Sequence, residues 1–196
     1  MLDPNLFFPT PLWVTKIKDY KETNEKIYSY IKNLYDQDKS GVIKSNIKGW
    51  HSNDFNMNEE EPKSFIKLVS PSIEKALKDM NWDIVNQNVK IASMWTIINK
   101  GGAANARHSH GGSALSAAYY VRAPKNCGEI VFYDPRPAPV YFHPKNNKPN
   151  PLNATVNSVN PVEGVLVLFP SYLDHSVNEN KSDEERIVIS FNINLT

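Results

Sequence analysis

The sequence is short of several features, and each shortage argues against a class of protein. Its 196 residues include a single cysteine, Cys127, so no internal disulfide can form and a reducing, cytoplasmic location is expected. No apolar run approaches the roughly 20 residues that a membrane-spanning helix needs. The first residues lack the basic start and apolar core of a secretory signal. The formal net charge of +1 gives no reason to expect a nucleic acid or a membrane surface as partner.

What remains is the composition of one globular domain. The chain is 40% hydrophobic and 22% charged, which is ordinary for a soluble protein with a sizeable core. No internal repeat or long flexible linker divides it. We therefore expect a single domain over 1–196, in which 1–89 form a supporting region of helices and a strand and 90–196 form the main core.

Two amphipathic helices are expected in the first half of the chain. Residues 20–39 and 60–82 both place apolar or aromatic side chains at spacings of three and four. Pro71 lies inside the second stretch and is expected to kink or split it, because proline lacks the N–H that a helix interior uses. Residues 11–17 favour an opening strand.

From residue 90 onward the pattern changes to short strands. Stretches rich in β-branched and aromatic residues are separated by Gly, Pro and Asn, which is typical of an all-β sandwich or barrel. A long Pro- and Asn-rich connection over 135–161 interrupts them, and such connections are usually functional or mobile. The strand stretches are 90–99, 114–122, 128–134, 164–170 and 186–195, with a weaker candidate at 154–159.

The last stretch, 186–195, has one apolar face and one mixed face that begins with an arginine. The apolar face needs cover, which the N-terminal helices can supply, whereas the mixed face would line an interior able to hold something polar. The expected architecture is mainly β with N-terminal helices: a barrel-like β-sandwich with the helices packed on one outer face. The apolar face holds Ile187, Ile189, Phe191, Ile193 and Leu195, and the mixed face holds Arg186, Val188, Ser190, Asn192 and Asn194.

Two of the five histidines lie one residue apart in the segment NARHSHGGS. Alternate residues of an extended chain project from the same side, so His108 and His110 can reach one metal ion. His175, which follows the hydrophobic stretch 164–170, is the best candidate for a third ligand. Three protein ligands would leave positions open for water, a cosubstrate and oxygen. The alternative is a solvated turn, with His175 as an ordinary loop residue.

Arginine is scarce, with four residues, and Arg186 begins a strand on its polar face. A buried arginine needs an anion. A dicarboxylate held by the guanidinium at one end and by the metal at the other would satisfy both cations. The alternative is an ion pair with one of the adjacent acids, Asp183, Glu184 or Glu185.

Five segments, in this order and spacing, resemble the 2-oxoglutarate/Fe(II)-dependent oxygenases of bacteria and tailed phages, a group related to the prolyl 4-hydroxylases. They are HSH, LSAAYYV, GEIVFYDPRP, GVLVLFPSYLDHSV and ERIVISFN, all within 90–196, with GWHS at 49–52 as a weaker match. The resemblance implies a double-stranded β-helix (jelly-roll) fold with sites for Fe(II) and 2-oxoglutarate. It implies a dioxygenase that hydroxylates its substrate and releases succinate and CO2, with ascorbate as a candidate reductant. A phage origin would place the protein in the host cytoplasm.

The resemblance also assigns roles to single residues. His108 and His175 match the two iron histidines. Arg186 matches the basic residue that pairs with the far carboxylate of 2-oxoglutarate, and Tyr120 and Ser190 are candidates to hydrogen-bond that carboxylate.

One position departs from the wider superfamily, which has Asp or Glu where this chain has His110. A neutral imidazole leaves Fe(II) with one more unit of uncompensated positive charge, which the dianionic cosubstrate could offset or which could shift the preference toward nickel or zinc. Asp134 or Asp174 could supply a carboxylate instead, although Asp174 would point away from its neighbour His175 in an extended chain. We expect three histidines.

Other residues carry weaker hypotheses. His51 either lines the substrate opening or packs in an aromatic corner, and Cys127, with little basic surrounding, is expected to be inert. The connection over 135–161 is a candidate substrate lid, the alternative being a loop anchored by its own aromatic side chains. The candidate lid residues are Tyr133, Arg136, Tyr141 and Phe142.

Two other classes of function stay open. Glycine-to-histidine spacings around His108 and His175 resemble the motifs of cupin dioxygenases, which do not use 2-oxoglutarate, but the expected glutamate is missing. A non-catalytic jelly-roll binding module is the other alternative. A protein side chain or a small molecule is favoured as substrate, and the near-neutral charge disfavours nucleic acid. The residues do not indicate an oligomeric state.

Overall fold

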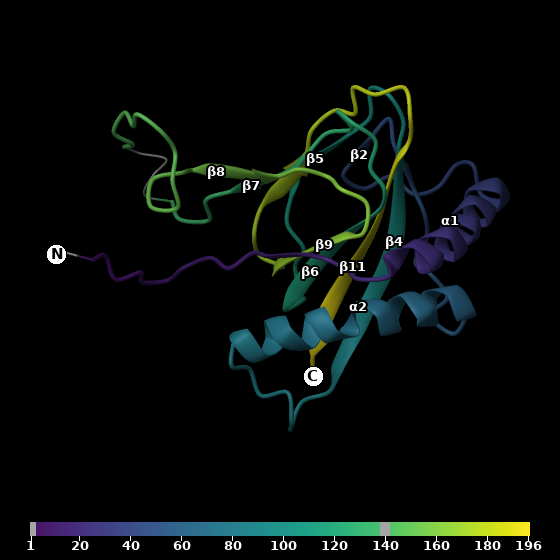
Figure 1. The fold of residues 1–196 in the computed structure, drawn as a ribbon, viewed down its shortest axis with the longest axis horizontal. Coiled ribbons are helices and arrows are strands. Elements are labelled where there is room, and N and C mark those ends of the chain that lie inside the picture. The colour runs from purple at the N-terminus through teal and green to yellow at the C-terminus, as the bar shows by residue number, and fades with distance from the viewer. Residues whose placement is uncertain (1–2, 138–141) are drawn as a thin grey trace.

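The computed structural model describes residues 3–137 and 142–196 (Figure 1). As predicted, this part of the chain is mainly β with two N-terminal helices. Neither of the two described helices combines the length and apolar character that a membrane span requires. The elements in chain order are β1 (Trp13–Lys16), α1 (Tyr20–Gln37), β2 (Asn46–Ile47), β3 (Trp50–His51), α2 (Glu60–Asp79), β4 (Val89–Asn99), β5 (Ala104–His108), β6 (Leu115–Arg122), β7 (Ile130–Tyr133), β8 (Val156–Val159), β9 (Val165–Pro170), β10 (His175–Val177) and β11 (Arg186–Leu195).

The strands form two antiparallel sheets. The larger sheet has the order β1-β9-β6-β11-β4-β3, and the smaller has the order β2-β5-β10-β7-β8. From β6 to β11 the chain passes repeatedly between the two sheets, which is the winding of a jelly roll. The predicted fold class is therefore confirmed, although the two sheets stay separate and do not close into a complete barrel.

Both helices cover the outer face of the larger sheet, on the same side of the molecule (Figure 1). The apolar face of β11 packs beneath them, as its alternation predicts. Phe65 of α2 lies edge-on to Tyr119 of β6 and to Phe191 of β11, with ring centroids 5.0 and 6.0 Å apart. Phe65 and Phe191 are fully buried, so they belong to the main core rather than to the cavity described below.

Helix α2 continues through Pro71, so the proline does not split it, and the alternative expectation of a kink stays a prediction. Pro71 lies on the exposed side of the helix, and so does Lys67, whose carbonyl loses its helical partner. Water can bond to a carbonyl on that side. The opposite face, which carries Phe65, Val69 and Ile73, is buried in the core and holds the helix together across the proline.

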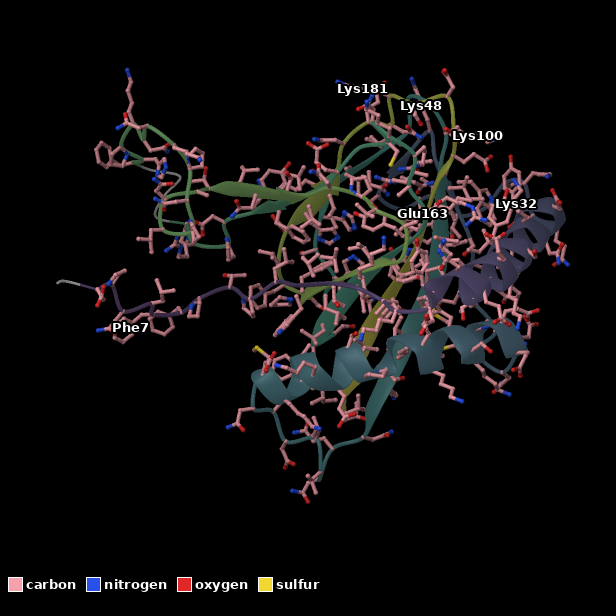
Figure 2. The ribbon with its side chains drawn as sticks, in the orientation of Figure 1. Phe7, Lys32, Lys48, Lys100, Glu163 and Lys181 are labelled. Carbon is pink, nitrogen blue, oxygen red and sulfur yellow. The ribbon has the colours of Figure 1, made fainter. Side chains whose placement is uncertain are left out.

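The β7–β8 hairpin carries the long connection and extends away from the body of the molecule, above the N-terminal segment (Figure 1). Strand β8 confirms the weak strand candidate at 154–159. Figure 2 shows Phe7 on the N-terminal segment at this end, far from Lys100 and Lys181. A groove of about 430 Å³ lies between the N-terminal segment and the hairpin, and Phe7 and Leu152 contribute to its walls.

Candidate metal centre

Three histidines meet at one end of the space between the sheets. His108, the last residue of β5, lies directly opposite His175, the first residue of β10. His110 lies two residues beyond the end of β5, so it is not part of the strand that the sequence argument assumed for it. Its backbone is held instead by a hydrogen bond, in which the His110 N–H donates to the carbonyl of Ser171 at 2.9 Å. One imidazole nitrogen of each ring lies within 4.8 Å of the other two. The structure therefore brings the three predicted ligands together.

Hydrogen bonds on the far side of two rings set their orientation. His108 Nδ1 lies 2.8 Å from the carbonyl oxygen of Ala106, and His175 Nδ1 lies 2.9 Å from that of Leu173. A carbonyl oxygen can only accept, so each Nδ1 carries the hydrogen. The lone pair of each Nε2 is thereby left for a metal.

Burial keeps two of the imidazoles neutral. Desolvation is the main cause that lowers the pKa of His175 to about 3 and that of His110 to about 4, and the charge of neighbouring His108 acts in the same direction. Neutral imidazole is the form that binds a metal. At pH 7 these two rings therefore need not lose a proton before they bind a metal ion.

Neither aspartate considered as an alternative ligand joins the histidines. Asp174 accepts hydrogen bonds from Arg107 Nε at 2.9 Å and Nη2 at 2.8 Å. Asp134 is bound in the same way by Arg136, at 2.9 and 2.7 Å. Among the described residues, the group around His175 with metal-ligand spacing consists of histidines alone.

An aromatic wall adjoins the histidines. The ring of His110 stacks on Trp95 at 5.6 Å and 16°, and Trp95 stacks on His51 at 5.6 Å and 11°. His51 is therefore part of an aromatic corner and also lines the cavity, and its role at a substrate opening stays a prediction. Trp95 was not singled out from the sequence. The alternation of β4 places Ser93, Trp95 and Ile97 on the cavity side and is the signal that could have found it.

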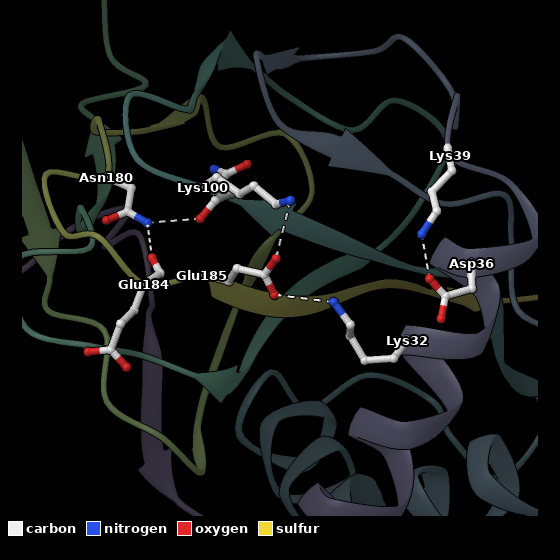
Figure 3. A network of polar contacts seen from close by, with 8 residues as sticks. Lys32, Asp36, Lys39, Lys100, Asn180, Glu184 and Glu185 are labelled. Carbon is white, nitrogen blue, oxygen red and sulfur yellow. Dashed lines mark hydrogen bonds and ion pairs between the residues drawn. The ribbon is translucent and has the colours of Figure 1, made fainter.

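A cavity of about 680 Å³ extends from the histidines into the space between the sheets, and Arg186 lies against it. Arg186 is 2% exposed and donates from Nη1 to the carbonyl of Gly128 at 3.0 Å, and its Nε has no partner among the described residues. Burial lowers the pKa of its guanidinium. Glu185 contacts Lys32 at 3.5 Å and Lys100 at 3.6 Å instead (Figure 3). The alternative of an ion pair with an adjacent acid is therefore wrong within the described part of the chain.

The other two cosubstrate candidates line the same cavity. Tyr120 lies on β6 opposite Val188 of β11, and burial raises the pKa of its phenol, so that it remains a hydrogen-bond donor at neutral pH. Ser190 lies on β11 two residues after Val188 and therefore on the same face of the strand. Cys127 is fully buried and burial raises the pKa of its thiol, which agrees with the expectation that it is inert.

The candidate lid residues lie elsewhere. Tyr133 packs under the guanidinium of Arg107, which is 4.1 Å from the ring centroid, and contributes with Arg136 to the groove beside the N-terminal segment. Phe142 is 79% exposed, and Tyr141 falls outside the described residues. None of the three described candidates lines the histidine cavity, and the lid stays a prediction.

Comparison with known proteins adds a family and a fold. The family model described as "Putative 2OG-Fe(II) oxygenase" matches residues 93–192. No curated protein matches the chain. A Pseudomonas putida prolyl-4-hydroxylase is similar in structure, with a TM-score of 0.66 and 11% identity over 94% of this chain and 92% of that one. The viral collagen prolyl hydroxylase of Paramecium bursaria Chlorella virus-1, in a 2OG complex, has a TM-score of 0.61 and 14% identity over 93% and 94%.

A third solved structure is HygX from Streptomyces hygroscopicus with nickel and 2-oxoglutarate bound, with a TM-score of 0.63 and 11% identity over 94% of this chain and 83% of that one. At such low identities these likenesses show the shared jelly-roll fold. The family match rests on the sequence, covers half of the chain, and includes His108, His110, His175 and Arg186. The chain belongs to the 2OG-Fe(II) oxygenase family and is an oxidoreductase of the kind that uses iron and 2-oxoglutarate.

Proposed function

We propose that the protein is a dioxygenase that hydroxylates a small molecule or a protein side chain, with release of succinate and CO2. In this proposal His108, His110 and His175 hold Fe(II). Arg186 binds the far carboxylate of 2-oxoglutarate, and Tyr120 and Ser190 add hydrogen bonds to it. The observation that carries the proposal is a buried guanidinium, without an anionic partner among the described residues, in the cavity that begins at three clustered imidazoles.

Charge balance supports this arrangement. A buried guanidinium without a counter-ion costs several kcal/mol, and three neutral imidazoles leave the two charges of a divalent metal uncompensated. 2-Oxoglutarate has a carboxylate at each end, so that one can meet the metal and the other Arg186. The iron supplies oxygen activation, a chemistry that protein side chains lack. The residues of the chain hold these groups in place and exclude water.

The outer part of the cavity favours a polar substrate of modest size. Its wall is the stack of His51 and Trp95, and its rim carries the exposed, oppositely charged Lys44 and Asp54 near His51. A mixed rim does not provide the basic surface that a nucleic acid would need. We propose a cytoplasmic location on the strength of the single, buried Cys127.

The test uses purified protein loaded with Fe(II). Anaerobic addition of 2-oxoglutarate should change the absorption spectrum of the metal centre, and oxygen with ascorbate should then yield succinate from slow, uncoupled turnover. The variants H175A and R186M should abolish the signal. Oxygen consumption that does not depend on 2-oxoglutarate would favour the cupin class, and failure to bind 2-oxoglutarate at all would favour a non-catalytic binding module.

A further inference from the structure

Two of the three ligand candidates belong to similar three-residue units, 106–108 and 173–175, which we call the ligand units. In each unit the histidine Nδ1 contacts the carbonyl oxygen two residues earlier, at 2.8 Å for His108 and 2.9 Å for His175. Such a hydrogen bond fixes the orientation of a ring relative to its own backbone. The distance between the two rings therefore depends on how the two ligand units are held together.

The strand pairing that joins the ligand units is short and irregular. Strand β5 pairs with β10 at His108 opposite His175 and again at Asn105 opposite Val177, and the register shifts between these two points. Such a shift disrupts the ladder of hydrogen bonds locally. Strand β5 also ends at His108, so the ladder does not continue past the two histidines. Backbone pairing alone therefore holds the histidines less firmly than a regular sheet would.

The side chains of the two middle residues join the ligand units directly. Nε and Nη2 of Arg107 donate to Oδ2 of Asp174 at 2.9 and 2.8 Å. The guanidinium of Arg107 also lies over the ring of Tyr133, 4.1 Å from its centroid. One arginine on β5 thus contacts both the residue that precedes β10 and a residue of β7.

Tyr133 of β7 completes the arrangement from the other side of β10. Its backbone N–H donates to the carbonyl of Asp174 at 3.0 Å, and its hydroxyl oxygen lies 3.0 Å from Ser176 Oγ. The residues before and after His175 are therefore both held against β7. Because Arg107 adds the contact to β5, these side chains connect three neighbouring strands at the point where two ligands meet.

We propose that Arg107 is a positioning residue for the metal centre. It holds the ligand units together in the metal-free protein, where the rings of His108 and His175 lie with centroids 4.3 Å apart. Ligands that are already in place bind more tightly, because binding does not have to order them. Asp174 then serves as the anchor for Arg107. The inference rests on the proposed function for the metal's role in catalysis, but the arrangement is a property of the metal-free protein.

The first experiment measures Ni(II) affinity by titration calorimetry, without turnover. The side chains of Arg107 and Asp174 are 54% and 38% exposed. An ion pair at such a site contributes a factor of up to about 5, and an exposed cation–π contact a factor of about 2 to 5. R107M should therefore bind Ni(II) roughly 3- to 25-fold more weakly. Loss of a positive charge near a cation would by itself strengthen binding, so a weakening reports geometry.

The chain offers a matched control for this substitution. Arg136 pairs with Asp134 through the same two guanidinium nitrogens, at 2.9 and 2.7 Å, and neither residue belongs to a ligand unit. R136M should bind Ni(II) as the wild type does. If R107M fails to fold, R107K tests the same idea, because it keeps the charge but loses the planar fork of donors, and it should weaken binding to a smaller extent.

Two further measurements separate positioning from general stability. In metal-free R107M the amide hydrogen of Tyr133 should exchange faster than in the wild type and in R136M, because its acceptor is the carbonyl of Asp174. The double variant R107D/D174R reverses the ion pair. It should bind Ni(II) more tightly than R107D alone, although it carries two more units of positive charge.

Two results would overturn the proposal: equal Ni(II) affinity in the wild type and a folded R107M protein, or equal losses of affinity in R107M and R136M. Failure of the proposed function gives a different result. In that case the wild type would bind Ni(II) and R107M would bind it more weakly, but the wild type would neither bind 2-oxoglutarate nor form succinate.

Discussion

Replacement of Arg186 by methionine should leave the metal-free protein as stable as the wild type, or more stable. Exchange of a buried charge for an apolar side chain of similar volume is often neutral or stabilises by about 1–4 kcal/mol. Arg186 makes one hydrogen bond, to the Gly128 carbonyl, and no acid among the described residues would be left without its partner. Loss of that bond costs about 1 kcal/mol. We therefore expect a change in the free energy of unfolding between about 0 and +3 kcal/mol.

The same substitution should remove 2-oxoglutarate binding. A guanidinium that holds a carboxylate makes two charge-assisted hydrogen bonds of about 1.5–3 kcal/mol each. Their sum of about 3–6 kcal/mol corresponds to a roughly 100- to 20,000-fold loss of affinity. A residue that only stabilised the fold would show the reverse pattern, with lower stability and unchanged affinity.

The assay combines urea unfolding without ligand and thermal unfolding with Ni(II) and 2-oxoglutarate. At a concentration about 100 times Kd, 2-oxoglutarate should stabilise the wild type by about 2.7 kcal/mol, which raises Tm by roughly 5–11 °C for a chain of this length. R186M should show no rise. R122M is the control, because Arg122 lies on β6, pairs with Glu25 at 2.8 Å and does not line the cavity. An R186M protein that keeps the full thermal shift, or that loses more than about 2 kcal/mol without ligand, would refute the reasoning.

Three further predictions concern stability and the site. His175 should contribute about 3 kcal/mol to the stability that the metal-free protein loses between pH 7 and 4, because its pKa is about 3 when folded and near 6.5 when unfolded, so only the unfolded state takes up the proton. Urea unfolding at several pH values measures this contribution as the difference between the wild type and H175A, and an equal pH slope in the two proteins would contradict it. G128A should lose stability, since Gly128 has φ +85° and an added Cβ would lie 2.1 Å from the Asn178 carbonyl oxygen. It should also lose 2-oxoglutarate affinity, because the Gly128 carbonyl accepts the hydrogen bond from Arg186 Nη1. An unchanged Kd in calorimetric titration would show that this hydrogen bond does not position Arg186 for 2-oxoglutarate. F65A should cost about 3–5 kcal/mol without changing Ni(II) affinity, and reduced Ni(II) binding by a folded F65A would show that the core and the site are coupled.

Much of the fold and several site residues could be predicted from the sequence because the relevant signals are local. The alternation of 186–195 already separates the side chains that pack under the helices from those that face the cavity, since successive residues of a strand point to opposite sides. The helices follow from apolar spacing in the same way. The chemistry of histidine and arginine, together with the resemblance to a known family, was sufficient to select the candidate site residues His108, His110, His175 and Arg186.

Only the tertiary structure decided how these residues meet. The pairing of His108 with His175 depends on the register between β5 and β10, which packing and hydrogen bonding over the whole sheet determine rather than either segment alone. The same holds for the stack of Trp95 on His110, which brings β4 against the segment that follows β5. Local sequence can say which face of a strand a side chain occupies, but the partner across the cavity is chosen by the packing of the complete chain.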